Sequence, residues 1–387
     1  MAENDVEKLR EISNYFYKTS GIYARACNYL ATLYRYDWYI VPEIYDEKLK
    51  EEKIVSEFNK ILNYLDNSSI KKLCGEIALN VIKNGAYYGY LVDSKDGIMI
   101  QELPVAFCRS RFNVNNFPTV EFNMRFFDKA FLDTNYRLKV LSLFPDEFKK
   151  GYMAYKSGKL SADSRIGLQD PTQDTLSSRW IQDTGWFMLD PTKTIKFSLN
   201  SGSDKCDIPL LINALPEILD LDAAQDLDRR KQLQKLLKVI VQKLPMDKNG
   251  DLIFDIDEAR DIHNNAVEML KRAVGVDVLT TFADIDSIDM SDKNTTTTQD
   301  DLKKVERSVF NALGISQNLF NTDGNMSLTM SILNDESSMR SLLFQFSNFF
   351  DRITQSQCAN KKKCNFRLYM LETSQYNYKD LSKMYKE

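Results

Sequence analysis

The sequence has little of what many enzyme active sites use. Its 387 residues include one histidine, His263, so a scheme that needs histidine both as a base and as a ligand has no second residue. No Gly-x-x-x-x-Gly-Lys-Ser/Thr loop and no Gly-x-Gly-x-x-Gly occurs, and only 14 glycines are present. A backbone cradle for phosphate groups is therefore not expected.

Paired cysteines are also missing. The six cysteines are scattered and form no Cys-x-x-Cys pair of the kind that holds zinc. We expect them to be free thiols in a reducing compartment. They are Cys27, Cys74, Cys108, Cys206, Cys358 and Cys364. The sequence thus predicts neither a metal nor any other cofactor.

Long apolar runs and an excess of one charge are absent as well. No apolar run approaches the roughly 18–20 residues needed to span a bilayer, and residues 1–8 are too polar for a secretory signal. The net charge of −4 argues against a strongly basic nucleic-acid binder. We expect a soluble chain of two or three domains, used in cytoplasm or in something assembled there, with no stable membrane association.

Several groups of polar residues resemble metal-binding, catalytic or nucleic-acid-binding sites. Residues 247–251 with Glu258 resemble a calcium loop, but Leu252 stands where the sharp bend needs glycine, so a hairpin turn is the favoured interpretation. Two acid clusters could in principle bind metals, but a solvated face is favoured. They are Asp220, Asp222, Asp226, Asp228 and Asp284, Asp286, Asp289. His263 is favoured as a structural residue, and residues 361–363, all lysine, as solvated surface.

The first 200 residues predict helices followed by an antiparallel sheet, which is an α+β fold class. Apolar residues at helical spacing indicate a helix over 1–35 with a break at residues 20–21, an end at Pro42, and helices over 54–65 and 70–82. Gly85 stops the last of these. Further predicted elements are strands over 86–93, 98–103, 105–114, 119–127, 186–189 and 194–198, and helices over 128–160 split at Pro145.

The stretch from Ile208 to Ile353 holds no residue that looks catalytic. It begins with a predicted helix over 212–230, a strand over 236–244, a tight turn over 247–251 and a strand over 252–254. A helix capped by Asp255 or Asp257 and ended by Gly275 follows, then a strand over 276–282 and a connector over 283–298. The last predicted elements are a helix over 299–313 ended by Gly314, a polar loop over 315–325 and a long helix over 326–353. The order of these elements is therefore the feature of this stretch that bears on its function.

This order resembles the portal proteins of tailed bacteriophages. In that family a stem helix leads to a small α/β clip, a second stem helix returns, a tunnel loop projects into a central channel, and a long helix crosses the wing toward a crown. Residues 312–320, followed by polar residues 321–325 and a helix, are close to the family pattern. Residues 84–93 look like part of the wing. The resemblance covers most of the chain and rests on the order of elements and on loose motifs.

The resemblance implies a division of the chain into named parts. These are residues 1–205 as N-terminal region and wing, 206–235 as first stem helix, 236–290 as clip, 291–314 as second stem helix, 315–327 as tunnel loop, 328–355 as long wing helix, and 356–387 as short crown or C-terminal tail. The clip is expected to dock partner proteins through Asp247, Lys248, Asn249 and Asp251. The tunnel loop is expected to face DNA through Gln317, Asn318, Asn321, Thr322, Asp323 and Asn325.

The resemblance also implies a function without catalysis. Portal proteins form a ring, typically of twelve copies, at one vertex of the viral capsid, and genome packaging and ejection pass through its channel. The expected partners are further copies of the chain, major capsid and scaffolding proteins, the terminase large subunit, head–tail adaptor or tail proteins, and double-stranded DNA bound non-specifically. The expected location is the virion, and the host cytoplasm during assembly. An acidic stem helix suits such a channel, because each Lys or Arg contact with phosphate would add affinity for DNA.

Two alternatives stay open. One is another head–tail connector ring protein, which should lack the wing sheet predicted over residues 86–127. The other is a DNA-processing enzyme with no recognised motif, whose activity would depend on acids such as Asp284 and Asp286.

Overall fold

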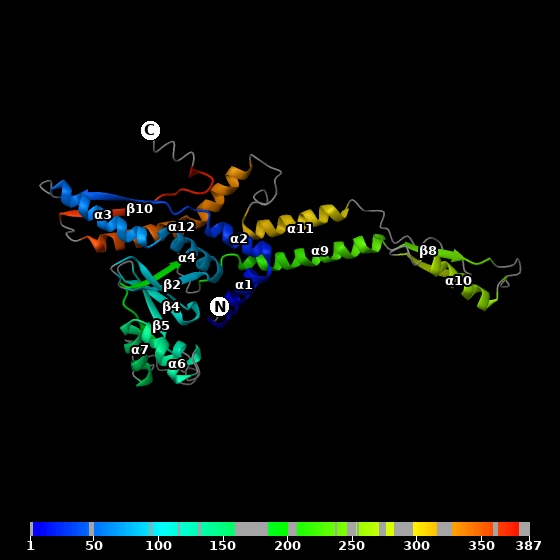
Figure 1. Ribbon diagram of the computed structural model, residues 1–387, viewed down its shortest axis with the longest axis horizontal. Coiled ribbons are helices and arrows are strands. Elements are labelled where there is room, and N and C mark those ends of the chain that lie inside the picture. The colour runs from blue at the N-terminus through cyan, green and yellow to red at the C-terminus, as the bar shows by residue number, and fades with distance from the viewer. Residues whose placement is uncertain are drawn as a thin grey trace, which may run out of the picture. The chain divides into compact units, whose positions relative to one another are not determined.

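A computed structural model of the chain has mixed helices and strands (Figure 1). It describes residues 3–45, 50–92, 94, 96–114, 117–130, 133–158, 185–199, 207–236, 238–245, 253, 255–270, 276–281, 297–315, 327–358 and 363–378. The chain divides into two compact units. The first combines Met1–Asn213 with Gly314–Glu387, and the second is Ala214–Leu313.

The first unit begins with two helices, α1 (Glu3–Thr19) and α2 (Gly21–Ala31), so the expected break at residues 20–21 is confirmed. Ser20 is the N-cap of α2, and its side chain accepts a hydrogen bond from the Tyr23 backbone N–H. The Tyr23 hydroxyl lies 2.8 Å from the Ser13 hydroxyl, which ties α2 to α1. The break is thus a capped corner between packed helices.

The next two helices, α3 (Glu51–Asn67) and α4 (Ile70–Asn84), also follow the predicted stripes. Gly85 ends α4 at φ +83°, in the left-handed region that favours glycine. Ser69 occupies the N-cap position of α4 but caps nothing with its side chain. Its neighbour Ser68 instead accepts a hydrogen bond from Ile98 N–H at 2.7 Å, and so holds the following hairpin to the helices.

One antiparallel sheet places β2 (Ala86–Val92) between β3 (Met99–Leu103) and β7 (Thr194–Ser198). β2 and β3 form the predicted hairpin, with Tyr88 opposite Leu103. On its other edge β2 pairs with β7, with Tyr88 opposite Lys196. The first five residues of β2 are buried, because the strand lies between two others and follows directly from α4.

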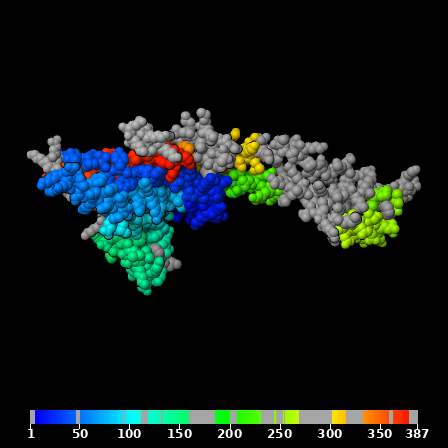
Figure 2. Space-filling model, turned by 45° about the horizontal axis from the view of Figure 1, so that its top comes forward, coloured from blue at the N-terminus to red at the C-terminus, as the bar shows by residue number. Residues whose placement is uncertain are grey.

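A second antiparallel sheet has the order β4 (Cys108–Val114), β5 (Phe117–Asn123), β6 (Trp186–Met188). The helices α5 (Arg125–Ala130), α6 (Thr134–Leu143) and α7 (Asp146–Lys156) follow it. The segment from β4 to α7 gathers into one continuous body in the space-filling view (cyan to green in Figure 2). Its phenylalanine cluster is Phe122, Phe127 and Phe148, all fully buried.

Two strand predictions in this region are partly wrong. Val105–Phe107 is a 3-10 helix (η1), and α5 replaces the last three residues of the strand predicted over 119–127. The Asn123 side chain accepts a hydrogen bond from the Arg125 backbone N–H at 3.1 Å, which turns the chain out of β5 and into α5. The helix then brings Phe127 to 6.1 Å from Phe122, ring centre to ring centre.

A third sheet pairs β1 (Trp38–Ile44) with β10 (Cys364–Met370), and neither strand was predicted. Pro42 lies inside β1 and does not end the element. Leu371 N–H donates to Asp37 O, and Tyr45 N–H donates to Lys363 O, so the odd-numbered residues of β1 face β10. Pro42 therefore falls where the backbone points away from the partner, and its missing N–H breaks no ladder bond.

The long helix α12 (Ser327–Gln357) confirms the predicted apolar stripe. Its buried residues are Met339, Leu342, Leu343, Phe346, Phe349, Phe350 and Ile353. The Asp351 carboxylate accepts hydrogen bonds from Leu368 N–H and from Arg367 Nε, each at 3.0 Å, so α12 also holds β10 in place. Residues 363–378, expected in a crown or tail, thus belong to the first unit. No helix in the part of the chain that the structure describes is long and apolar enough to cross a membrane.

Candidate functional site: a helical hairpin with an α/β tip

The second unit is built on two long helices, α9 (Leu215–Leu236) and α11 (Thr297–Leu313), which pack against each other (Figure 1). A 3-10 turn, η3 (Ile212–Ala214), precedes α9. The Ser308 hydroxyl donates to Glu217 Oε2 at 2.7 Å. Since Glu217 lies in the first turn of α9 and Ser308 near the end of α11, the two helices are antiparallel.

An apolar seam joins the two helices. Leu215, Ile218 and Leu221 recur every three residues on α9 and are buried, as are Val309 and Leu313 on α11. Each such side chain contributes roughly 1.5–3 kcal/mol when fully buried. Gly314 then follows α11 at φ +67°, which confirms its predicted role as the terminating residue.

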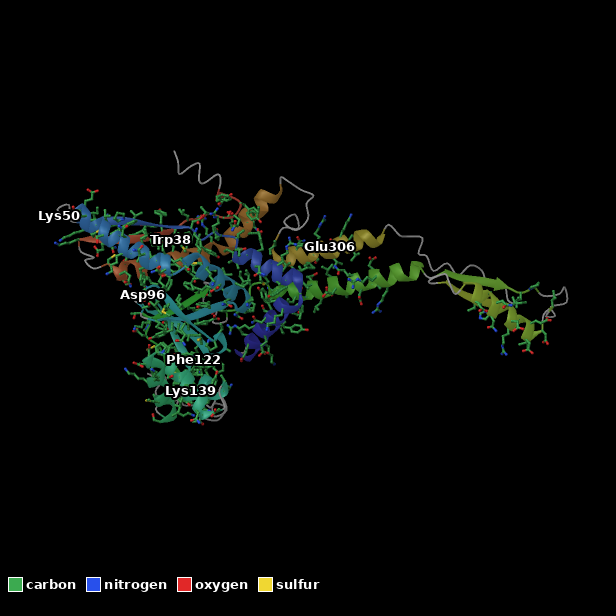
Figure 3. The ribbon with its side chains drawn as sticks, viewed as in Figure 1. Trp38, Lys50, Asp96, Phe122, Lys139 and Glu306 are labelled. Carbon is green, nitrogen blue, oxygen red and sulfur yellow. The ribbon has the colours of Figure 1, made fainter. Side chains whose placement is uncertain are left out.

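The outer sides of the two helices differ in charge. On α9, Leu219 and Leu227 are 54% and 55% exposed, and the exposed acids are Asp220, Asp222 and Asp226. Arg229 and Arg230 are exposed farther along the helix, and Arg230 lies 3.6 Å from the Asp226 carboxylate. On α11 the exposed residues are Lys303, Lys304, Arg307, Asn311 and Ala312. Figure 3 shows the side chains of both helices, with Glu306 labelled on α11. The outer side of α9 therefore carries acids around apolar residues up to Leu227 and cations beyond it, whereas the exposed charges described on α11 are cations.

The acids were expected to form a solvated face, and for Asp220, Asp222 and Asp226 this is confirmed. Asp228 is half-buried. Within the described ranges, no group of three or more His, Cys, Asp or Glu side chains could hold a metal ion. The second acid cluster, Asp284, Asp286 and Asp289, lies outside the described residues.

The tip of this unit is a strand–helix–strand motif. β8 (Lys238–Lys243) and β9 (Val276–Thr281) pair in parallel, with Lys238 opposite Val276, and α10 (Ile256–Leu270) connects them and packs against β9. The prediction of a small α/β element is confirmed. The predicted strand over 252–254 is wrong at Ile253, which lies in a bend, and the predicted turn over 247–251 lies outside the described residues. Parallel strands cannot be joined by a tight turn and need a crossover, which α10 supplies.

The start of α10 gives a structural role to Glu258, the last residue of the apparent calcium loop. The Asp255 carboxylate accepts a hydrogen bond from Ile256 N–H at 2.8 Å, and its carbonyl accepts one from Ala259 N–H at 2.9 Å. Glu258 reaches back to accept a hydrogen bond from Asp255 N–H at 3.3 Å. Asp255 is therefore the N-cap, and Glu258 plays the glutamate role of a capping box.

The predicted docking residues Asp247, Lys248, Asn249 and Asp251 lie outside the described residues. The side chains described next to them are Ile253 and Ile256, which are 54% and 66% exposed. Sequence reasoning missed this exposed pair, because Ile253 was assigned to a strand. His263 lies half-buried on α10. The apolar pair adds a feature suited to binding a partner protein at the tip.

The predicted tunnel-loop residues also lie outside the described residues. They are Gln317, Asn318, Asn321, Thr322, Asp323 and Asn325. On either side the structure describes Ile315, which is buried in the first unit, and α12, which begins at Ser327. Their assignment to the channel stays a prediction.

In the first unit, a polar latch holds the segment that precedes α9. We call Arg10, Asn84, Gly85, Lys196 and Asp207 the entry latch. Arg10 donates from Nε to Asn84 O at 2.8 Å and from Nη2 to Asp207 O at 3.0 Å. Lys196 Nζ lies 2.9 Å from Asp207 Oδ2, and Asp207 is only 5% exposed. A Cβ atom at Gly85 would lie 2.6 Å from the carbonyl carbon and oxygen of Asp207.

The entry latch was not predicted. The sequence indicated only a linker at residues 201–204, and the partners of Asp207 come from three separate elements. The latch fixes the backbone of residues 207–210 on the first unit, as Leu210 N–H also donates to Ile82 O at 3.1 Å. The chain therefore enters η3 and α9 from a firmly held segment.

The strongly shifted ionisable groups described lie in the first unit and are buried or half-buried. The pKa of Asp335 on α12 is raised to about 6 by burial and to a lesser extent by the nearby Glu336, although Tyr29 lowers it by donating a hydrogen bond at 3.0 Å. Burial also raises the pKa of the Cys27 thiol to about 12. Such a thiol stays protonated and is a poor nucleophile. As expected, the five described cysteines form no disulfide bond, and all five are buried. They are Cys27, Cys74, Cys108, Cys358 and Cys364.

Comparison with known proteins gives little beyond the geometry. No family model and no curated protein matches the chain. One similar solved structure is a chain described as the neck of an empty GTA particle computed with C6 symmetry. It is 8% identical, with a TM-score of 0.44, over 96% of this chain and 87% of that chain. At this level of similarity no argument is built on the likeness.

Proposed function

We propose that this protein is a portal protein of a tailed bacteriophage or a phage-like particle, which forms a ring at one capsid vertex. The observation that carries the proposal is the order of parts around the helical hairpin. Two antiparallel helices, α9 and α11, flank the β8–α10–β9 tip, and the long helix α12 follows. The chain resembles portal proteins in this order.

In this proposal each unit has a mechanical role. The first unit, with its sheets and α12, serves as the wing that sits in the capsid. α9 and α11 serve as stem helices along the channel, and the tip serves as the clip, which docks first the terminase motor and then a tail adaptor. Residues 315–327 serve as the tunnel loop. In the first unit β10 pairs with β1, so in this proposal residues 364–370, which the resemblance assigns to a crown or tail, are part of the wing.

The charges of the hairpin suit a channel for DNA. Residues 215–228 of α9 carry five acids and no basic residue, and the basic residues Arg229, Arg230, Lys231 and Lys235 follow them in the same helix. Phosphate groups gain affinity from each basic contact through release of counterions, so a stem with few basic groups turned toward the channel lets DNA slide. The protein then guides DNA without holding it, and needs no catalytic residue.

The decisive test is the oligomeric state of the purified full-length chain. Negative-stain images should show rings with a central hole, of about the twelve copies that the family resemblance implies. A chain that stays monomeric at all concentrations would overturn the proposal. A ring that binds tail proteins but not the terminase large subunit would favour another kind of head–tail connector.

A test of the tunnel loop uses deletion of Asn321–Gly324. The ring should still assemble, whereas DNA packaging or retention should fall. Packaged DNA of normal length and stability in particles with this deletion would contradict the assignment of the loop.

A further inference from the structure

The two outer sides of the hairpin are complementary to each other. Residues 219–227 on the outer side of α9, here called the acidic side, expose Leu219, Ala223 and Leu227 in one stripe, with Asp220 and Asp222 flanking it. The exposed Arg229 and Arg230 lie beyond this segment. The outer side of α11, here called the basic side, exposes Lys303, Lys304 and Arg307. Each side lies away from the buried seam on its own helix. The hairpin therefore cannot bring its own two sides together.

The charged groups lie at matching heights along the hairpin. The hydrogen bond from Ser308 to Glu217 sets the two helices side by side at that level. Both helices rise by about 1.5 Å per residue in opposite directions. Asp220 and Asp222 are three and five residues beyond Glu217, and Val305 and Lys303 are three and five residues before Ser308. The acids are thus level with the cations Lys303 and Lys304.

We propose that the acidic side of α9 in one copy docks on the basic side of α11 in a second copy of this chain. Charge complementarity indicates a second copy of the chain as the partner, because exposed acids on α9 fit exposed cations on α11. The long aliphatic parts of these lysine and arginine side chains can also cover Leu219 and Leu227. The two surfaces differ, so the contact is heterologous, and repeated around an axis along the hairpin it closes a ring. This inference rests on the proposed function for the ring and adds the surfaces that build it.

The interface has a predictable response to salt. Exposed charge pairs are screened beyond about 10 Å at 0.1 M ionic strength, and charge pairing mainly governs which surfaces recognise each other. Assembly should therefore weaken as salt rises, and reversing the charges on one side should set like charges against each other. Reversing both sides should restore recognition.

The test uses the full-length chain in three charge-reversed forms. Variant A carries Asp220→Lys and Asp222→Lys, variant B carries Lys303→Glu and Lys304→Glu, and variant AB carries all four. Glu7→Lys with Glu11→Lys, on exposed positions of α1, is the matched control. Circular dichroism checks that each keeps its helices, and mass photometry with negative stain measures assembly.

Variants A and B alone should each need at least about tenfold more protein for half-assembly than the wild type or the control. An equimolar mixture of A and B should assemble, because the lysines of one face the glutamates of the other, and AB should assemble by itself. Recovery in the mixture also shows that neither variant had merely misfolded.

Three outcomes would overturn the inference. If the wild type forms rings and variants A and B form them equally well, the surfaces are wrong while the proposed function survives. A wild type that never assembles overturns both. A loss of double-stranded DNA binding in variant B, with unchanged assembly, would make the basic side a DNA surface.

Discussion

The phenylalanine cluster of the first unit and the helical hairpin of the second place their apolar side chains in opposite ways. Around β5, the rings of Phe122, Phe127 and Phe148 are fully buried between a sheet and three helices. In the hairpin, one seam is buried, while Leu219 and Leu227 stay more than half exposed. Two helices alone can bury only one side of each. The cluster is thus complete within one chain, whereas the hairpin has surface left for other molecules.

The largest expected effect on the free energy of unfolding comes from truncating one apolar side chain in each region. Phe122→Ala removes a ring that contacts Phe148 and Phe126 at 5.3 and 5.7 Å between ring centres. It should lower the free energy of unfolding by about 3–5 kcal/mol. Leu219→Ala should change it by no more than about 0.5 kcal/mol, because the side chain is exposed within one chain. Urea unfolding of dilute protein measures both.

Equal losses for the two variants would break the comparison. A large loss for Leu219→Ala that appears only at concentrations where rings form would sharpen it, because the leucine would then be buried by a second copy.

A second pair of variants separates the cost of a left-handed backbone conformation from the cost of a steric clash with a neighbouring backbone. Gly85 and Gly314 both have φ in the left-handed region, at +83° and +67°. A Cβ at Gly85 would overlap the Asp207 backbone at 2.6 Å, whereas a Cβ at Gly314 would meet nothing within 4 Å. Gly314→Ala should cost about 1–2 kcal/mol from strain alone, and Gly85→Ala should cost at least about 1 kcal/mol more.

Thermal and urea unfolding of the two alanine variants supply the measurement. Similar losses would mean that residues 207–208 move aside without cost, and that the entry latch does not hold the segment before α9. Lys196→Met offers an independent check on the latch, since it leaves the Asp207 carboxylate buried without its cation.

How much of this could be predicted from sequence depends on how local each signal is. Gly85, Gly314, Ser20 and Asp255 act on neighbours in the chain, and their roles as helix ends or caps were correctly predicted. The stripe on α12 was equally clear, because its spacing repeats over many turns. The predicted tunnel-loop and docking residues lie outside the described part, so their roles stay predictions.

The missed features depend on partners that are distant in the chain. β1 pairs with β10 more than 300 residues away, and Pro42, which lies within β1, was interpreted as the end of the N-terminal part. β8 and β9 read as strands, but their parallel pairing follows from the α10 crossover and not from any local turn. The entry latch joins Arg10, Asn84 and Asp207, which no spacing in the sequence brings together.

A third prediction concerns pH and the first unit alone. Asp335 is 3% exposed, and burial raises its pKa to about 6 from an ordinary value near 3.8. The folded protein therefore binds this proton more tightly than the unfolded chain does, so this group's contribution to stability is present below about pH 4 and is lost as pH rises through about 6. The loss is at most about 3 kcal/mol.

Asp335→Asn removes that titration while keeping a hydrogen-bonding group beside Tyr29. The difference in unfolding free energy between variant and wild type should shift in favour of the variant by about 1–3 kcal/mol between pH 4 and pH 7. Taking the difference cancels other titrating groups, such as Asp37 and Asp128, whose pKa values are lowered in the folded state through hydrogen bonds to lysine. A difference that does not vary with pH would contradict the assignment.

The smallest expected effect lies at the tip of the second unit, where Glu258 serves either as a helix cap or as a ligand for a cation. Glu258→Ala removes the acceptor for Asp255 N–H and should cost α10 about 0.5–1 kcal/mol, without any change on addition of calcium. Asp257→Ala, one residue earlier in the same turn, is the matched control and should cost less. Hydrogen exchange of the α10 amides measures the local loss. Protection of α10 that rises with calcium in the wild type, and not in Glu258→Ala, would show that the glutamate binds a cation and that the tip has a ligand rather than a cap.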